Sequence, residues 1–332
     1  MNTLEDTEFG RQFSAKLAGR RFPFSGQWEL TCRCNLHCIM CYTDCFNTPD
    51  RIRQELSLAE IIRIMDEIQE EGCLELCLTG GEPLARRDFL DVYTYAKEKG
   101  FLVTVFTNGT LITEAIANHW FRCPPSMIEI SFHGLTRESF ERITQGPGSY
   151  ERCLEGIRLI RERNLPLTLK TTGMTVNRDE VLKIKNFVEY LGTAGGKKVH
   201  YKFGAEIRSR LDGSENVYQH QLSAEEIDKI ERADEDFWVE RRRQDRLSAQ
   251  RQLRGEGLCG GGHNKFHIDA YGQLQLCSGN RRQSYDLRHG SFQEGFYRFL
   301  PRFPCPYRQP LAQQELLSIE TRRHPGTAKE GA

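Results

Sequence analysis

The sequence lacks the long apolar runs and the charge imbalance that would place it in a membrane or on nucleic acid. No stretch of its 332 residues approaches the roughly 18 consecutive apolar residues that a spanning helix needs. Lys and Arg total 46 and Asp and Glu total 46, so no chain-wide basic field attracts phosphates. The N-terminus, MNTLEDTEFGRQF, is polar and acidic, unlike a signal peptide. We therefore expect a cytoplasmic protein with no membrane and no nucleic-acid partner.

Cysteine is also too scarce for a disulfide-built protein, since the chain has 12 among its 332 residues. Their grouping is more informative than their number, because five lie between residues 32 and 45 and three more lie in the last quarter of the chain. Two groups indicate two metal sites. The remaining four are scattered and are expected to pack as small apolar side chains: Cys73, Cys77, Cys123 and Cys153.

Between residues 26 and 207, short apolar runs alternate with longer amphipathic stretches, which is typical of repeated βα units. Parallel strands with helical crossovers either open into a doubly wound sheet or curl toward a barrel. Six units are too few for the full eight-unit barrel. The predicted strands are Gln27–Thr31, Leu74–Thr79, Leu102–Thr107, Met127–Phe132, Leu165–Thr171 and Val199–Ile207.

After residue 211 the composition changes, and we predict three further parts. Residues 212–254 form a helical connector whose charged run, residues 240–246, is expected to be a solvated helix face. Residues 255–310 form a small module, here called the C-terminal module, with a predicted hairpin of His263–Ile268 and Gln273–Leu276. Residues 1–25 are an N-terminal extension, 26–211 the βα core and 311–332 a tail.

The strongest motif is Cys34-Asn-Leu-His-Cys38-Ile-Met-Cys41, here called the cysteine loop, directly after the first predicted strand. A short C-x3-C-x2-C loop can direct three thiolates at a cubane iron–sulfur cluster and leave one iron open. A structural zinc site is the alternative, and it would need a fourth ligand such as Cys45 or His37.

A second motif, Thr79-Gly80-Gly81-Glu82-Pro83-Leu84, ends the second predicted strand. By itself, a tight turn would explain its glycines. Together, the two motifs lie at the carboxyl ends of adjacent parallel strands, where α/β folds bind ligands.

With these motifs the sequence, from about Gln27 to Arg308, resembles the radical S-adenosylmethionine (radical SAM) enzymes. Further matching segments are Phe106–Gly109, Ile130–Gly134, Ile143–Tyr150 and Leu169–Thr172. The resemblance implies an α/β fold, a partial (β/α)6 TIM-like barrel with a small α+β module. It also implies a 4Fe–4S cluster whose open iron binds the amino and carboxylate groups of S-adenosylmethionine. The implied cluster ligands are Cys34, Cys38 and Cys41, and Gly80, Gly81 and Glu82 would hold the methionine amino group.

Four further positions follow from the resemblance alone. Met40 lies where the family often has an aromatic residue beside the adenine, and Ser131 resembles the serine that contacts the ribose. Lys170 would pair with the methionine carboxylate, although an ordinary surface lysine is the alternative. Asn108 is a candidate cofactor contact or a residue that stabilises its turn. The sequence singles out no catalytic acid or base.

The second cysteine group resembles the auxiliary-cluster module, called SPASM, of peptide-modifying members. Cys259, Gly272 and Cys277 have its C-x12-G-x4-C spacing, and Cys305 lies where another ligand is expected. Because no cysteine follows Cys305, the resemblance implies the shortened, twitch form with one auxiliary iron–sulfur cluster. Its fourth ligand is open between substrate, solvent and Cys45, and Cys32 has no assigned role. The alternative is that these cysteines are buried apolar side chains.

The function implied is reductive cleavage of S-adenosylmethionine to a 5'-deoxyadenosyl radical, which abstracts hydrogen from a peptide or protein. The outcome would be a crosslink, an oxidation or an epimerisation. A small-molecule biosynthetic intermediate is the alternative substrate, and a non-catalytic metal–cysteine or electron-carrier protein is a third reading. Expected partners are a reductant such as flavodoxin or ferredoxin and, because residues 1–25 are too few for a leader-binding domain, a separate leader-peptide-binding protein.

Overall fold

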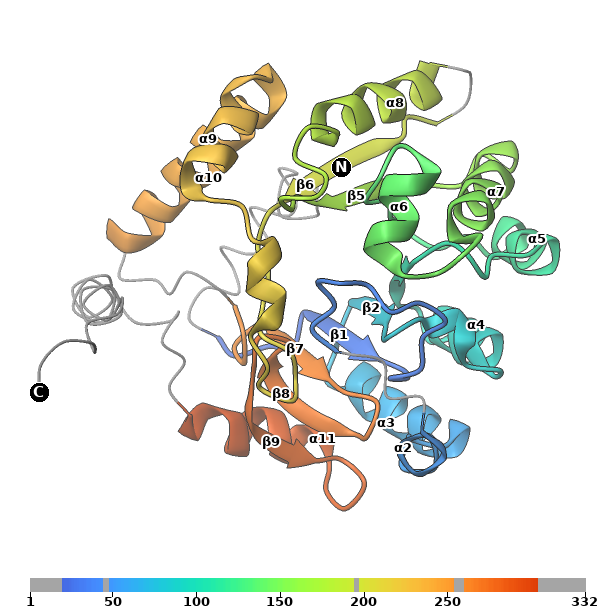
Figure 1. Ribbon diagram of the computed structural model, residues 1–332. Helices are drawn as coiled ribbons and strands as arrows, with labels where there is room; N and C mark the ends of the chain where they lie inside the picture. The colour runs from blue at the N-terminus through green and yellow to red at the C-terminus, as the bar shows by residue number, and fades with distance from the viewer. Residues whose placement is uncertain (1–19, 44–47, 194–196, 254–259, 304–332) are drawn as a thin grey trace, which may run out of the picture.

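The computed structural model describes residues 20–43, 48–193, 197–253 and 260–303, and it shows a curved sheet with helices on its outer face (Figure 1). The first six strands match the six predicted ones within a few residues. They are β1 (Ser25–Glu29), β2 (Glu75–Thr79), β3 (Leu102–Thr107), β4 (Met127–Ser131), β5 (Leu167–Thr172) and β6 (His200–Gly204).

Helices connect these strands, as the apolar spacing predicts. Several begin at a side chain that accepts a hydrogen bond from the first turn, such as Ser57 and Thr136. They are α2 (Pro49–Arg53), α3 (Leu58–Glu70), α4 (Phe89–Glu98), α5 (Glu114–Arg122), α6 (Arg137–Thr144), α7 (Ser149–Glu162) and α8 (Val181–Thr193), with a 3-10 turn, η2, at Pro83–Ala85.

The strand order distinguishes a barrel from a doubly wound sheet. Neighbours in the sheet run β6-β5-β4-β3-β2-β1, all parallel and in sequence order. A doubly wound sheet would reverse its order at a switch point, and this one does not. The curvature and the order confirm the predicted partial barrel.

The C-terminal module continues the same sheet. Strand β7 (Lys265–Ile268) pairs in parallel with β1, and β8 (Gln273–Cys277) and β9 (Asn280–Asp286) follow as antiparallel neighbours. The predicted hairpin is therefore confirmed. The module ends in α11 (Phe292–Glu294), a π-helical turn η4 (Gly295–Phe299) and η5 (Leu300–Arg302).

The predicted connector is helical, and it extends away from the sheet in Figure 1. It contains η3 (Asn216–His220), α9 (Ala224–Arg232) and α10 (Glu235–Leu253). Its junction with the barrel is ionic, because Lys185 of α8 binds Asp234 and Asp236 through its Nζ at 2.7 and 2.8 Å.

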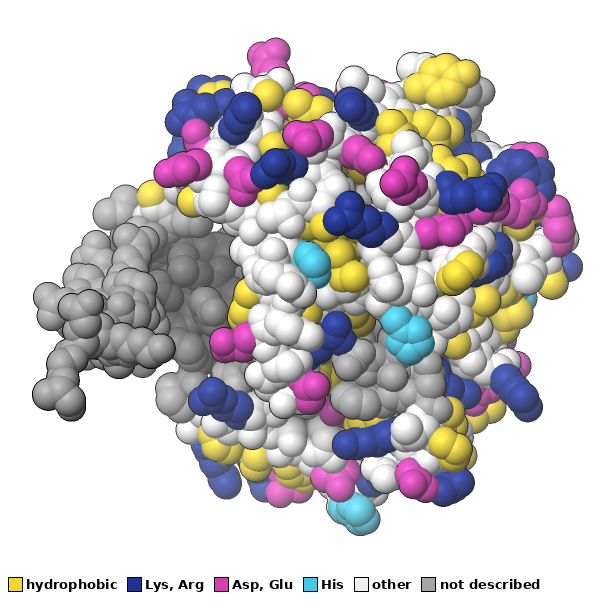
Figure 2. All heavy atoms as spheres, viewed as in Figure 1, with side chains coloured by type: hydrophobic (Ala, Val, Ile, Leu, Met, Phe, Trp, Pro, Cys, Tyr) yellow, Lys and Arg dark blue, Asp and Glu magenta, His cyan; other side chains and the backbone are white. Residues whose placement is uncertain are grey.

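Alternation along the strands divides the apolar core from the inner face of the barrel. Leu76 and Leu78 of β2 are fully buried and belong to one core cluster with Ile61 and Ile64 of α3. Cys77, between the two leucines, therefore points to the inner face. Positive and negative side chains are interspersed over the surface that Figure 2 shows. Among the residues described, no helix has both the length and the apolar character needed to cross a bilayer.

Candidate functional site

The cysteine loop follows β1 and is fixed by backbone hydrogen bonds to the last two residues of α6. The amides of His37 and Ile39 donate to the carbonyls of Thr144 and Ile143 at 3.0 and 2.9 Å. These bonds place the loop over the carboxyl ends of the parallel strands, which is where the sequence predicts the site.

Gly80–Glu82, here called the GGE segment, runs alongside the residues that lead into the cysteine loop. The amides of Gly81 and Glu82 donate to the carbonyls of Thr31 and Arg33 at 2.8 and 2.7 Å. A Cβ at Gly80 would lie 2.4 Å from the Thr31 oxygen, and one at Gly81 would lie 2.5 Å from the Arg33 oxygen. Close approach of the two motifs therefore requires both glycines, which is a structural reason independent of any ligand.

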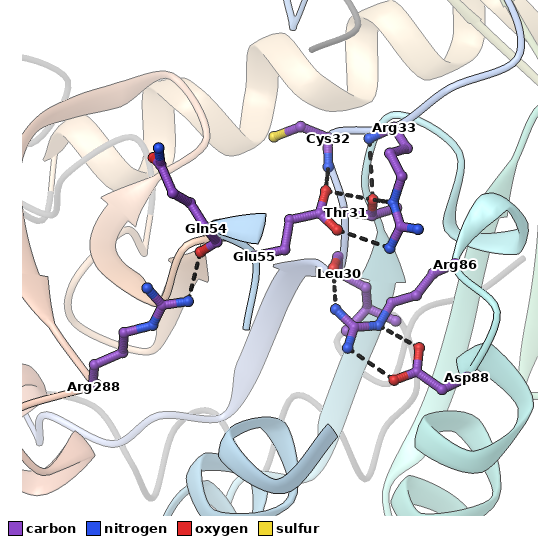
Figure 3. A network of polar contacts seen from close by, with 9 residues as sticks. All are labelled: Leu30, Thr31, Cys32, Arg33, Gln54, Glu55, Arg86, Asp88 and Arg288. Carbon is purple, nitrogen blue, oxygen red and sulfur yellow. Dashed lines mark hydrogen bonds and ion pairs between the residues drawn. The ribbon is translucent and has the colours of Figure 1, made fainter. Parts of the chain in front are cut away.

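A buried polar network supports the start of the loop (Figure 3). The Glu55 carboxylate accepts hydrogen bonds from the Thr31 hydroxyl at 2.7 Å and the Cys32 amide at 2.9 Å, and it pairs with the Arg33 guanidinium at 2.9 Å. Arg86 donates to the Leu30 carbonyl at 3.0 Å. These contacts fix the backbone immediately before the first predicted ligand.

The three thiols of the loop lie near one another. Burial, followed by the neighbouring Cys41 and Cys34, raises the pKa of Cys38 well above its ordinary value. The Cys34 sulfur lies 3.7 Å from Asn108 Nδ2, and the Cys41 sulfur lies 3.0 Å from Thr43 Oγ1. Bound iron ions would offset this repulsion between neighbouring thiolates, so the three residues fit the iron ions of a cluster.

A zinc site and an iron–sulfur cluster differ in how their ligands converge. Within the four described ranges, no set of three or more Cys, His, Asp or Glu side chains is arranged to hold a single metal ion. A zinc site needs its ligands to converge on one ion, whereas each thiolate of a cubane binds a different iron.

Glu82 is completely buried and accepts three hydrogen bonds. Thr107 Oγ1 and the Leu84 amide donate to Oε1 at 2.7 and 3.1 Å, and the Asn108 amide donates to Oε2 at 2.6 Å. Burial nevertheless raises the pKa of Glu82 to about 7. A carboxylate oxygen has two lone pairs, so Oε2 retains capacity for one more donor.

Asn108 acts within its own turn and also reaches the cysteine loop. Its Oδ1 accepts from the Thr110 amide at 2.9 Å and hydroxyl at 2.6 Å, and its Nδ2 donates to Asn35 Oδ1 at 2.9 Å. The hydrogen bonds to Thr110 are those of a residue that stabilises its own turn, and the bond to Asn35 connects that turn to the cysteine loop.

Ser131, Lys170 and Lys202 form one cross-strand row on β4, β5 and β6. Lys202 Nζ lies 2.6 Å from Oε2 of the buried Glu129, whereas Lys170 Nζ lies 3.7 Å from Oε1. The Lys170 side chain is 44% exposed, and the Ser131 hydroxyl makes no hydrogen bond to the described residues. Lys170 and Ser131 thus offer polar groups to a ligand.

The sequence reading missed Glu129 and Lys202. The signal available was a charged residue at alternate positions between apolar ones, in Ile128-Glu-Ile130 and Tyr201-Lys-Phe203, which indicates a strand with a polar inner face. Glu129 is 3% exposed, so its two lysines compensate a buried charge.

Two more side chains, Met40 and His133, have defined surroundings. Met40 packs with Ile39 against a small apolar cluster that includes Ile143 and Met174. The His133 ring is buried, and its Nδ1 accepts from the Thr172 amide at 3.1 Å. Burial, with the charge of Lys170, lowers the pKa of His133 to about 3, so this imidazole is neutral and carries its proton on Nε2.

Of the second cysteine group, Cys277 lies within the described residues. It ends β8, half-buried, beside a turn to which Arg281 donates through Nε at 2.9 Å and Arg208 through Nη1 at 3.3 Å. Cys259, Cys305 and the candidate Cys45 lie outside the described residues. Cys32 is buried, and burial raises its pKa to about 12, which favours the neutral thiol.

Comparison with known proteins agrees with the fold and with the resemblance found in the sequence. Residues 28–188 match the family model described as the radical SAM superfamily. An AdoMet-dependent heme synthase of Methanosarcina barkeri is 33% identical over 165 residues, covering 50% of this chain and 47% of that protein. A PqqA peptide cyclase of Granulibacter bethesdensis is 32% identical over 167 residues, covering 49% and 43%. The chain spans about half the length of these curated relatives.

Solved structures show the same fold at low sequence identity. Streptococcus suis SuiB has a TM-score of 0.64 at 13% identity, covering 87% of this chain and 69% of that chain. Native anSMEcpe with bound AdoMet has a TM-score of 0.64 at 17% identity, covering 83% and 80%.

Residues 28–188 therefore form a radical SAM domain, and the enzymes of this superfamily use a 4Fe–4S cluster and S-adenosylmethionine. The predicted family and the partial barrel are confirmed. The roles of individual residues, the domain boundaries and the auxiliary cluster stay predictions.

Proposed function

We propose that this protein cleaves S-adenosylmethionine reductively and uses the resulting 5'-deoxyadenosyl radical to abstract hydrogen from a peptide or protein side chain. The observation that carries the proposal is the hydrogen-bonded contact between the GGE segment and Thr31 and Arg33, which lead into the cysteine loop, at the carboxyl ends of β1 and β2. That contact brings together a three-thiolate site and a buried carboxylate within a radical SAM domain.

Cys34, Cys38 and Cys41 would hold the cluster, whose bound form supplies the electron that breaks a carbon–sulfur bond of the cofactor. The GGE segment would receive the methionine ammonium, because Glu82 Oε2 retains one lone pair for a charged donor. An ammonium there would also favour the ionised form of a carboxyl whose pKa is raised by burial.

The cross-strand row would bind the rest of the cofactor. Lys170 is the less tightly paired of the two lysines at Glu129, so it is the one we assign to the methionine carboxylate. Ser131, adjacent to it in register, would contact the ribose. The adenine would lie beside the backbone at Met40, and Asn108 would position the Cys34 end of the loop.

A peptide substrate is supported by likeness to two groups of proteins. The relatives include PqqA peptide cyclases, and SuiB, which shares the fold, has been solved bound to the precursor peptide SuiA. AdoMet-dependent heme synthases are similar over a comparable share of the chain, which keeps a small-molecule substrate as the second candidate. A flavodoxin- or ferredoxin-like reductant, a separate leader-binding protein and a cytoplasmic location complete the proposal.

The proposal includes one auxiliary iron–sulfur cluster, with Cys259, Cys277 and Cys305 as ligands in a twitch-type module at residues 255–310. The support is the position of Cys277, because the guanidinium groups of Arg208 and Arg281 both bind its turn.

The test is anaerobic reconstitution of the full chain with iron and sulfide, followed by measurement of 5'-deoxyadenosine. Cys38→Ala should abolish deoxyadenosine formation while circular dichroism remains unchanged. Cys123→Ala is the matched control, because this partly exposed cysteine lies at the end of α5. Turnover retained in Cys38→Ala would overturn the proposal.

A second variant separates the two clusters. Cys277→Ala should leave cleavage of S-adenosylmethionine largely intact and reduce iron by about four per chain, the content of one cubane. Peptides encoded beside the gene are the first substrates to assay by mass spectrometry for loss of hydrogen. Unchanged iron in Cys277→Ala would remove the auxiliary cluster from the proposal.

A further inference from the structure

Glu29, the last residue of β1, carries a buried carboxylate that belongs to none of the predicted site motifs. It is 1% exposed. A carboxylate at such a position requires a cation and hydrogen-bond donors, because burial of an uncompensated charge is costly.

Its partners come from distant parts of the chain. Arg281 of β9 grips the carboxylate through both terminal nitrogens, with Nη1 at 2.8 Å from Oε2. The Tyr42 hydroxyl donates to Oε1 at 2.8 Å. His267 Nε2 of β7 lies 3.4 Å from Oε1. The C-terminal module therefore supplies the cation, and the residue that follows Cys41 supplies a hydroxyl.

Tyr42 is held on two further sides. The Arg281 guanidinium lies 5.4 Å from the centre of the Tyr42 ring, within the range of a cation–π contact. The Tyr42 carbonyl accepts a hydrogen bond of 2.8 Å from the amide of Leu211, which follows β6. One residue thus links the end of the cysteine loop to β1, to β9 and to the chain after β6.

The two ends of the cysteine loop are consequently fixed by different parts of the protein. The amides of His37 and Ile39 bind carbonyls of the barrel itself, at residues 144 and 143. The Cys41 end is fixed through Tyr42 by a carboxylate whose cation belongs to the C-terminal module.

We infer that Glu29 and Arg281 are positioning residues through which the C-terminal module sets the Cys41 end of the cysteine loop. The effect on cluster binding rests on the proposed function. The contacts that join Tyr42 to Arg281 through Glu29 do not depend on it. Neither residue is assigned contact with substrate or cofactor. The C-terminal module would then fix the position of the Cys41 end of the cysteine loop even if the module itself binds no auxiliary cluster.

The first experiment uses the metal-free full chain and measures hydrogen exchange at single amides by mass spectrometry. The reporter is the Leu211 amide, which is bonded to Tyr42, and the internal control is the Ile39 amide, which is bonded to the barrel. In Arg281→Ala we expect Leu211 to exchange at least about tenfold faster while Ile39 is unchanged, because only local opening is altered.

Two further variants keep the test decisive. Tyr42→Phe removes only the hydroxyl, so it should accelerate exchange at Leu211 even if Arg281→Ala fails to fold. Arg288→Ala is the matched control, since Arg288 also joins the C-terminal module to the barrel, but at the Gln54 carbonyl (Figure 3). Equal exchange at Leu211 in the wild type and in Tyr42→Phe would overturn the inference.

Reconstitution with iron then tests the consequence for the cluster. Arg281→Ala should retain less iron than Arg288→Ala and show an altered electron paramagnetic resonance spectrum of the reduced protein. If the wild type binds no cluster, the proposed function fails, while the exchange data still decide the positioning role. If exchange changes but iron and spectrum do not, the link to cluster binding is overturned.

Discussion

The buried carboxyl of Glu82 makes a specific prediction about pH and stability. Burial raises the pKa of Glu82 from 4.5 to about 7. Between these values the folded chain holds a proton that the unfolded chain has released, so the free energy of unfolding decreases as the pH rises. Below pH 4.5 the cost of the buried charge is absent, and above about pH 7 it is fully present.

The size of the effect follows from the two pKa values. Their difference, 7 minus 4.5, corresponds to about 3 kcal/mol at roughly 1.36 kcal/mol for each tenfold change in proton affinity. Glu82→Gln does not titrate, so its stability lacks this contribution. Its amide places an NH2 group near the Asn108 amide, and that penalty is the same at both pH values and cancels in the comparison.

The assay is urea unfolding of the metal-free wild type and of Glu82→Gln at pH 5 and pH 8. Between the two pH values, the stability of Glu82→Gln relative to the wild type should rise by about 2.5 kcal/mol, because part of the full effect is already present at pH 5. Glu225→Gln, at an exposed position on α9, is the control and should show no such change. A constant difference between the wild type and Glu82→Gln would refute the reasoning.

Two further substitutions test the contacts beneath the site. Gly81→Ala should lower stability by about 1–3 kcal/mol, because its Cβ would lie 2.5 Å from the Arg33 oxygen. Gly204→Ala, with open space around the new Cβ, is its control in thermal unfolding, and equal melting temperatures would count against the close-approach explanation. Glu55→Ala should cost about 3–5 kcal/mol in urea unfolding, because it removes one partner of a buried ion pair. A loss below about 1 kcal/mol would show that Arg33 and the Cys32 amide find water instead.

Much of the barrel could be predicted from the sequence, because its strands are short apolar runs separated by amphipathic helices. The third strand, Leu102–Thr107, matches its prediction at both ends. Parallel order then places the cysteine loop and the GGE segment side by side, so proximity of these two motifs follows from the pattern alone.

The contacts made by the C-terminal module could not be predicted from the sequence pattern. Strand pairing between β7 and β1 joins residues about 240 positions apart, and no local periodicity encodes such a pairing. The two hydrogen bonds from Arg281 to the Glu29 carboxylate depend on that pairing, so the sequence pattern indicated neither residue. Cys77 was expected to pack as an apolar side chain, yet strand alternation turns it toward the inner face and leaves it partly accessible.

The position of β1 between β2 and β7 has a consequence for biosynthesis. A ribosome releases β1 and β2 early, but the second edge of β1 stays without its β7 partner until residue 268 has emerged. During that interval the nascent chain exposes strand hydrogen-bonding groups and holds Glu29 without its guanidinium. Chains interrupted before β7 should therefore need chaperones or aggregate, and the sheet should complete its folding only after β7 has left the ribosome.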